Sequence, residues 1–267
     1  ASIWSRVVEV LEANEDWGRV GGSSGQRVNV EFVSANPTGP LHVAHGRGAA
    51  IGDVVASLLE QVGDQVTREF YVNDAGRQIL LLGESVGARF DELQGRPFSI
   101  PEGGYHGDYV VDVARSISEA VGEEVLDALD PKDRRKEIQD LAVEMLREEQ
   151  RCDLEAFGVH MDGFFSESSL YESGAIDNLL KLLKGRELIY EEEGATWLRT
   201  SNFGDEKDRV LIKGDGSFTY FLPDLAYHLD KAERDFDLAI DVWGADHQGH
   251  EQRMEAALGS LDKPDLL

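Results

Sequence analysis

Apolar and polar positions change their period twice near the start of the chain. Val28, Val30 and Phe32 alternate with Asn29 and Glu31, and this period of two predicts a strand with unlike faces. Beyond a turn, apolar residues recur at spacings of three and four, which predicts a helix with one apolar face. These residues are Ile51, Val54, Val55, Leu58, Leu59 and Val62. A second strand carries Val66, Phe70 and Val72. Strand, helix and strand in this order predict a βαβ unit of a parallel sheet.

A similar pattern returns near the end of the chain. Residues 238–243 form a mostly apolar run, which is typical of a strand buried in a parallel sheet. The helix predicted after it carries its apolar residues on one face: Met254, Ala257, Leu258 and Leu261. Residues 217–222 also read as a strand, and Pro223 would fix a turn directly after it.

The turn between the first strand and the first helix combines rigid and permissive residues. Pro37, Gly39 and Pro40 exclude a helix there, and His42 and His45 follow where the helix begins. A helix N-terminus offers unpaired N–H groups and a partial positive charge, and imidazole donors one turn in add hydrogen bonds at the same place. The turn therefore predicts a phosphate site.

Two alternatives to a phosphate site also account for the His-x-x-His spacing. A chance pair of histidines or a metal site would produce it, but the zincin metal motif requires Glu where Val43 follows His42. Gly46 and Gly48 would let a nucleotide approach the backbone closely. Together with the Pro/Gly turn and the apolar helix, they favour a nucleotide site over a metal site, so we predict no metal ligands.

Four blocks follow one another along the chain. They are Val-Glu-Phe-Val-Ser-Ala-Asn-Pro-Thr-Gly-Pro-Leu-His-Val-Ala-His-Gly-Arg-Gly (residues 30–48), Phe-Tyr-Val-Asn-Asp-Ala-Gly-Arg-Gln (70–78), Phe-Ser-Glu-Ser-Ser-Leu-Tyr (165–171) and Trp-Gly-Ala-Asp-His (243–247). Their order and spacing resemble the class I aminoacyl-tRNA synthetases, and specifically the arginyl-tRNA synthetase family. The resemblance runs through residues 28–260, nearly the whole chain.

The resemblance implies a reaction and its substrates. In that family the carboxylate of L-arginine attacks the α-phosphate of ATP, which arrives with Mg²⁺, and the arginyl group then passes to the 3′ end of tRNA(Arg). The protein must position two anions and stabilise the charge that grows on the phosphates. His42 and His45 at a helix N-terminus suit this catalytic role.

The resemblance also implies binding residues. The positions for ATP are Gly39, His42, Ala44, His45, Gly48, Gly244 and Asp246, and the last of these corresponds to the ribose position. The positions for arginine are Glu31, Asn36, Tyr220, Asp224 and His247. A planar guanidinium with five donors needs carboxylates such as Glu31 and Asp224. Ala44 stands where the family pattern has glycine, so adenine would meet one extra methyl group there.

Several of these residues have simpler readings from the sequence alone. Tyr220 reads as a core aromatic residue, and Asp224 and Asp246 read as helix caps. Three further histidines have no partner at an informative spacing, and we assign them no role. They are His106, His160 and His228.

The predicted fold class is α/β, with a doubly wound parallel Rossmann-type sheet split by a large helical and mixed insertion. Residues 1–26 read as the tail of a preceding domain with a Gly/Ser-rich linker. Residues 27–80 and 207–267 are the expected halves of the catalytic domain. Residues 81–206, rich in charged helix formers and with a hairpin around Trp197, are the expected insertion.

Composition adds a large negative charge. With 26 basic and 52 acidic residues the net charge is −26, which we interpret as adaptation to a salty cytoplasm such as that of haloarchaea. Ordinary acidity is the alternative reading. The absence of an apolar run of about 18 residues excludes a membrane span, and a single cysteine fits a reducing compartment. We therefore expect a cytoplasmic monomer.

Two rival functions remain open at this point. Another class I synthetase, or a nucleotidyltransferase with the same histidine motif, would not need Glu31 and Asp224. A catalytically inactive nucleotide- or tRNA-binding relative is the second rival. The family also carries a Lys-Met-Ser-Lys-Ser-like loop and a helical anticodon-binding domain beyond the second half of its fold. Because this chain stops at Leu267 before either, we expect a fragment that is itself inactive.

Overall fold

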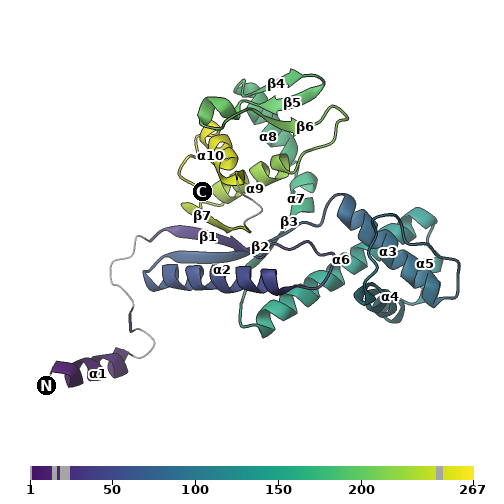
Figure 1. Ribbon diagram of the computed structural model, residues 1–267, viewed down its shortest axis with the longest axis horizontal. Helices are drawn as coiled ribbons and strands as arrows, with labels where there is room; N and C mark the ends of the chain where they lie inside the picture. Colours follow the sequence, from purple (N-terminus) through teal and green to yellow (C-terminus); the bar gives the residue numbers. More distant parts are fainter. Residues whose placement is uncertain (1, 14–16, 19–24, 245–248) are drawn as a thin grey trace.

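The computed structural model describes residues 2–13, 17–18, 25–244 and 249–267. A parallel four-stranded sheet forms its centre, in the order β3 (Gly163–Ser166), β2 (Gln65–Val72), β1 (Arg27–Phe32) and β7 (Leu238–Val242). The chain passes from β1 to β2 through α2 (Val43–Gln61) and later adds β7 on the other side of β1. Helix α2 covers one face of the sheet, and α9 (Phe221–Glu233) covers the other (Figure 1). The predicted doubly wound α/β fold is confirmed.

Strand β1 is central and is buried on both faces. Val28, Val30 and Phe32 belong to the apolar core beneath α2. Asn29 and Glu31 are also buried, on the side that faces α9. The two unlike faces predicted from the alternation are present, and the polar face is covered by a helix instead of by solvent.

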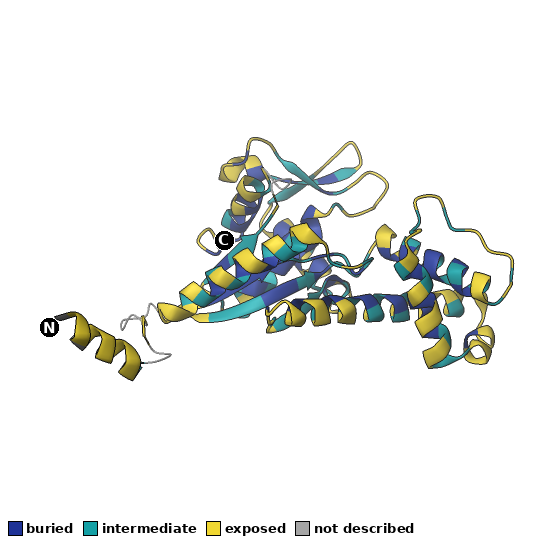
Figure 2. Cartoon of the chain, turned by 60° about the horizontal axis from the view of Figure 1, so that its bottom comes forward, coloured by how far each residue is buried: buried dark blue, intermediate teal, exposed yellow. Residues whose placement is uncertain are grey.

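Helix α2 packs on the sheet through small residues. Ala49, Gly52 and Ala56 are its buried positions, and Val55 and Leu59 are half-buried beside them. The predicted single apolar face is therefore wrong in part, because four of its residues are 44–62% exposed on the outer side of the helix (Figure 2). These four are Ile51, Val54, Leu58 and Val62. Helix α2 lies so close to β1 that small residues fill the contact, since a Cβ at Gly52 would lie 2.1 Å from Cγ of Phe32.

Two further units flank the sheet. The first is helical, with α3 (Arg77–Leu93), α4 (Asp108–Val121), α5 (Glu123–Asp127) and the long α6 (Pro131–Ala156) around a separate apolar core. Asp130 caps α6 by accepting hydrogen bonds from the backbone N–H groups of Lys132 and Asp133. Leu154 at the far end of α6 joins the core of the parallel sheet, so α6 connects this helical unit to the fold.

The second unit lies on the α9 side of the sheet (Figure 1). It contains α7 (Glu167–Glu172), α8 (Ala175–Gly185), the 3₁₀ helix η2 (Thr200–Phe203), α10 (His250–Ser260) and an antiparallel sheet of β4 (Ile189–Glu192), β5 (Ala195–Leu198) and β6 (Arg209–Ile212). The hairpin expected around Trp197 is β4–β5. Strand β5 precedes the domain boundary predicted at residue 206 and β6 follows it, yet the two strands pair. The predicted limits of the domains stay a prediction.

One predicted element is wrong. Residues 217–222 do not form a strand, because the chain bends after a single bridge at Phe218 and enters α9 at Phe221. Pro223 lies in the first turn of α9, where its missing N–H costs nothing and its fixed φ suits the helix. Helix α1 (Ser2–Ala13) lies apart from the sheet in Figure 1. In the part of the chain that the structure describes, no helix combines the length and apolarity needed to cross a bilayer.

Gly52→Ala tests the close packing of α2 on β1. We expect it to lower the free energy of unfolding by about 1–3 kcal/mol, because the new methyl group collides with the ring of Phe32. The matched control is Gly87→Ala in α3, where an added Cβ would meet nothing within 4 Å. That control should raise stability by up to about 1 kcal/mol through helix propensity. Urea denaturation measures both, and equal effects would contradict the packing argument.

Candidate functional site

Two adjoining cavities lie at the carboxyl ends of β1, β2 and β7. Their volumes are about 750 Å³ and 820 Å³. They share one wall, made of Val33, Ser34, Tyr71, Asn73, Val242, Trp243 and Gly244. In open α/β sheets, ligands bind outside the carboxyl ends of the strands where the strand order reverses, and β1 is that point here. We call the smaller one, which reaches Asp224, the acidic cavity, and the larger one, which reaches His42, the histidine cavity.

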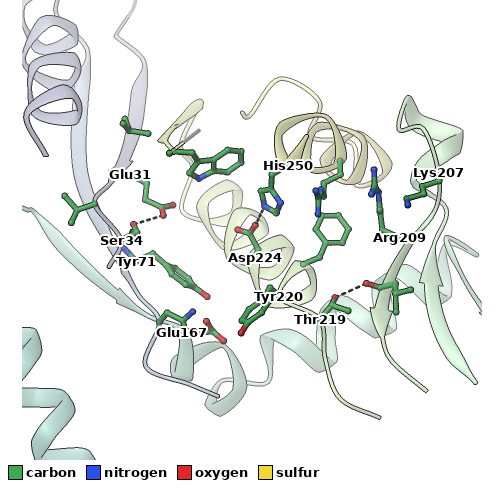
Figure 3. A pocket seen from close by; sticks show the side chains of 18 of the residues that line it. Glu31, Ser34, Tyr71, Glu167, Lys207, Arg209, Thr219, Tyr220, Asp224 and His250 are labelled. Carbon is green, nitrogen blue, oxygen red and sulfur yellow. Dashed lines mark hydrogen bonds and ion pairs between the residues drawn. The ribbon is translucent and has the colours of Figure 1, made fainter. Parts of the chain in front are cut away.

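The acidic cavity collects three of the residues predicted for arginine. Glu31, Tyr220 and Asp224 line it, and Glu167 and His250 face the same space (Figure 3). Tyr220 is 80% exposed, so its alternative reading as a core aromatic residue is wrong. The chain thus places carboxylates from β1, α7 and α9 around one space of a size suited to a small molecule.

Asp224 is held as a carboxylate. Its Oδ2 lies 2.5 Å from Nε2 of His250, and its Oδ1 lies 3.3 Å from Nδ1 of His228. Burial opposes ionisation of Asp224, but the hydrogen bonds from His228 and His250 outweigh it and lower its pKa. Tyr220 occupies the N-cap position of α9 and Asp224 lies within the first turn, so the alternative reading of Asp224 as a helix cap is wrong.

Glu31 has a partner on each oxygen. Its Oε1 accepts a 2.8 Å hydrogen bond from the Ser34 hydroxyl, and its Oε2 accepts one of 2.8 Å from Nζ of Lys231. Burial raises the pKa of Glu31, and the charge of Lys231 opposes that rise. The orientation of Glu31 in the cavity therefore depends on two neighbouring side chains.

The wall between the cavities is strained. Val33 and Ser34 have φ values of 71° and 43°, in the left-handed region that β-branched residues avoid. The Ser34 hydroxyl oxygen also accepts a 3.1 Å hydrogen bond from the backbone N–H of Tyr71, which ties the bend to β2. Backbone strain of this kind costs about 1–3 kcal/mol and is held where the surrounding structure over-determines it. Because of this bend, Val33 and Ser34 line both cavities.

The histidine cavity lies at the N-terminus of α2. It is lined by His42, Ala44, His45, Gly48 and Asn36, whose roles in binding ATP or arginine stay predictions. The rings of His42 and His45 stack with centroids 3.7 Å apart. The backbone N–H of His42 donates to Nδ1 of His45 at 3.3 Å, which leaves Nε2 of His45 as a donor. Burial and the charge of His42 lower the pKa of His45, so its neutral form is favoured.

The remaining predicted residues divide into three cases. Gly244 lies in the shared wall, as expected for an ATP position. Gly39 lies in the turn before α2, and an added Cβ there would contact the ring of Tyr109 at 3.4 Å. Asp246 and His247 fall outside the described residues, so their predicted roles stay predictions.

The helical insertion holds the turn from outside the sheet. The buried Gln150 on α6 donates hydrogen bonds to the carbonyl oxygens of Asn36 and Gly39, at 3.0 and 2.9 Å. The Tyr109 hydroxyl on α4 donates to the carbonyl oxygen of Thr38 at 2.8 Å. Neither residue was predicted, because nothing in the sequence links positions more than seventy residues apart to this turn.

Sequence reasoning missed three more residues around the acidic cavity. Glu167 lies within the third quoted block, which would have been its signal. The expectation that His228 has no partner is wrong, since it lies four residues after Asp224 on one helix face and contacts it. Lys231 continues that face toward Glu31. The spacing of Asp224, His228 and Lys231 at four and three residues would have indicated their neighbourhood.

The described residues contain no group of three or more His, Cys, Asp or Glu side chains that could hold a metal ion. The site instead offers a helix N-terminus with imidazole donors beside a carboxylate-lined cavity. This arrangement suits an anion in the histidine cavity. Lys207, Arg209 and Arg253 also line the acidic cavity, so the part of it formed by Glu31, Glu167 and Asp224 is the part that suits a cation (Figure 3).

Residues 6–259 match the family of tRNA synthetases class I (R), catalytic domain. The chain belongs to this family. The resemblance drawn from the four sequence blocks is thereby confirmed.

Relatives and solved structures agree. The chain is 47% identical over 258 residues to an arginine–tRNA ligase of Bacillus pumilus, covering 97% of this chain and 46% of the relative. It is 48% identical over 261 residues to that of Syntrophotalea carbinolica, covering 97% and 47%. A crystal structure of an arginyl-tRNA synthetase from Campylobacter jejuni superposes with a TM-score of 0.86 at 36% identity, over 98% of this chain and 57% of that one. The chain spans about half the length of the curated relatives it matches.

Gln150→Met tests how the turn is held. The variant keeps the side-chain length but leaves two carbonyl oxygens without their donor, each at a cost of about 1–3 kcal/mol if it stays buried. We therefore expect faster amide hydrogen exchange in residues 36–45 with little change in the sheet. Gln139→Met, on the same helix but packed against Gly83 of α3, is the control. Unchanged exchange in the turn would show that α6 does not hold it.

Proposed function

We propose that this site forms arginyl-adenylate from L-arginine and ATP, and that the native protein transfers the arginyl group to tRNA(Arg). The observation that carries the proposal is the pair of cavities with opposite electrostatic preference and a shared wall at the ends of β1, β2 and β7. The names of the relatives support the same activity.

The acidic cavity is the proposed site for the arginine side chain. Asp224 and Glu31 supply carboxylate oxygens for a planar guanidinium, and the exposed Tyr220 adds a hydroxyl at the mouth. A neutral or apolar side chain would desolvate these carboxylates further without adding a charge-assisted hydrogen bond to them. Asn36 and His247 are the proposed contacts for the amino and carboxylate groups of the substrate.

The histidine cavity is the proposed site for ATP, which enters with Mg²⁺ bound to its phosphates. The carboxylate oxygen of arginine bonds to the α-phosphorus while the bond to the pyrophosphate oxygen breaks. His42, His45 and the first N–H groups of α2 face the phosphates and stabilise the negative charge that grows on them. Gly48 and Gly244 line the nucleotide path, Gly39 shapes the turn, and Asp246 is the proposed ribose ligand.

Asp224→Asn tests arginine recognition in the whole native protein. Removing the negative charge loses a charge-assisted hydrogen bond worth about 1.5–3 kcal/mol, so the KM for arginine should rise roughly ten- to hundred-fold. The KM for ATP should change little. Arginine-dependent ATP–pyrophosphate exchange in the presence of tRNA measures both constants. Asp230→Asn, on the same helix but paired with Arg234, is the control. Equal effects of Asp224→Asn on both substrates would contradict the assignment.

His42→Ala and His45→Ala test the phosphate site. Each should lower the turnover of adenylate formation by about 10²–10³, the size seen when one preorganised donor is removed. Arginine binding, measured by calorimetry, should be nearly unchanged. His160→Ala removes an exposed histidine away from both cavities and serves as the control. Unaltered turnover in both variants would mean that ATP does not react at this helix.

A further inference from the structure

A layer of charged side chains is buried between α9 and the parallel sheet, directly behind the acidic cavity. At its centre is Lys231, whose side chain is 0% exposed. Its Nζ donates to Oε2 of Glu31 on β1 and to Oδ1 of Asp241 on β7, each at 2.8 Å. It also lies 4.3 Å from the centre of the Tyr227 ring. One ammonium group therefore bridges a carboxylate that lines the cavity and one that does not.

The second member is His228, which is 1% exposed. Its Nε2 lies 2.7 Å from Oδ2 of Asp241. Its Nδ1 lies 2.9 Å from the backbone carbonyl oxygen of Asp224 and 3.3 Å from Oδ1 of the same residue. Both ring nitrogens thus face acceptors only, and a ring with a proton on each nitrogen is the form that satisfies them. His228 is an imidazolium in this environment.

Asp241 joins the two cations. Its two oxygens are shared between Lys231 and His228, and the side chain is buried. Burial opposes ionisation of Asp241, but the charges of Lys231 and His228 lower its pKa to about 2. In the other direction, Asp241 and Asp224 outweigh the effects of burial and of Lys231 and raise the pKa of His228 to about 10. The charge states indicated by the hydrogen bonds and by the electrostatics agree. We call Lys231, Asp241 and His228 the buried triad.

We propose that Lys231, Asp241 and His228 are positioning residues that keep Glu31 and Asp224 ionised and aimed into the acidic cavity, and so make the site selective for a guanidinium. This inference rests on the proposed arginine function. None of the three residues lines the cavity, so they act through the two carboxylates that do. Glu31, Asp224 and Asp241 face the two buried cations Lys231 and His228, which favour the ionised form of the two carboxylates that line the cavity.

The physical reason is desolvation. Glu31 is buried, and its pKa is already raised despite Lys231, so removing that cation would favour the protonated acid. A protonated Glu31 cannot pair with a guanidinium, and binding then weakens in proportion to the fraction of protein that stays ionised. For Asp224, loss of His228 removes both a hydrogen bond and a charge on the side away from the substrate.

Other titratable groups near Glu31 and Asp224 also affect the ionisation of these two carboxylates. Glu31 also faces Tyr71 on β2 and Tyr227 on α9, and Asp224 also faces His250 on α10, Tyr71 and Glu167 on α7. Neighbouring Glu69 is paired with Arg234 and the Tyr227 hydroxyl, and forms a separate pair beside the buried triad. These groups are common to the wild type and the variants below, so a difference between them reports on the buried triad.

Lys231→Met and His228→Gln in the whole native protein test the proposal. Lys231→Met should raise the KM for arginine about tenfold or more at pH 7, as expected if Glu31 is ionised only a tenth of the time. His228→Gln should raise it by a smaller factor, because His250 still pairs with Asp224. Turnover at saturating arginine and the KM for ATP should stay within about twofold. Selectivity for arginine over citrulline, which carries a neutral ureido group, should fall by the same factor. Lys184→Met on the exposed side of α8 is the control.

The pH profile separates positioning from a merely structural role. Between pH 6.5 and 8.5 the KM for arginine should be flat in the wild type. In Lys231→Met it should fall as the pH rises, because deprotonation of Glu31 restores the binding form. If turnover falls and the KM values for arginine and ATP both rise, without this pH dependence, the proposal is overturned.

The wild-type protein gives a measurement that needs no folded variant. In ¹⁵N NMR spectra, the ring of His228 should carry protons on both nitrogens at pH 8, where an ordinary histidine is neutral. A neutral ring would overturn the proposal. If the wild type does not bind arginine at all, the proposed function fails; if it binds arginine and both variants bind it equally well, only the role of the buried triad fails.

Discussion

The charged layer between α9 and the parallel sheet is the constraint on which the site depends. Polar residues on β1, β2 and β7 lie on the face of the sheet that α9 covers, so they are buried by α9 and need partners from it. Their partners lie on one face of α9 and at its C-cap. They are Tyr227, His228, Lys231 and the C-cap residue Arg234. Removing one partner of a buried ion pair costs about 3–5 kcal/mol, so the helix has essentially one register on the sheet. That register carries Asp224 to the edge of the acidic cavity.

The opposite face of the sheet follows a different rule. There the packing is apolar and close, with Gly52 of α2 set against the ring of Phe32. Because α2 approaches so closely, its N-terminus and His42 and His45 are held at a fixed height beside the end of β1. One face thus sets the position of the histidines by shape, and the other sets the position of the carboxylates by charge.

The two faces meet at the strained bend of Val33 and Ser34. This bend forms part of the wall of both cavities, and its serine hydroxyl bonds to Glu31 on one side and to the backbone of Tyr71 on the other. The turn that follows is held by Gln150 and Tyr109 from the helical insertion. A change in the insertion can therefore reach the histidine cavity through three backbone carbonyl groups without altering the sheet.

The sequence by itself determined the parallel α/β fold and the strand–turn–helix around His42 and His45, because period and turn chemistry are local properties. The order of the four blocks added Glu31 and Asp224 through the family resemblance, whereas Glu167 was missed. Tertiary structure decided the rest. Small residues, not the large apolar ones, bury α2, since contact depends on the shape of the partner. Residues 217–220 form a bend and Pro223 lies in a helix because α9 begins at Phe221 and packs on the sheet. His228 and Lys231 gained their charge states only when folding placed Asp241 and Glu31, far away in the sequence or on another strand, within hydrogen-bond distance.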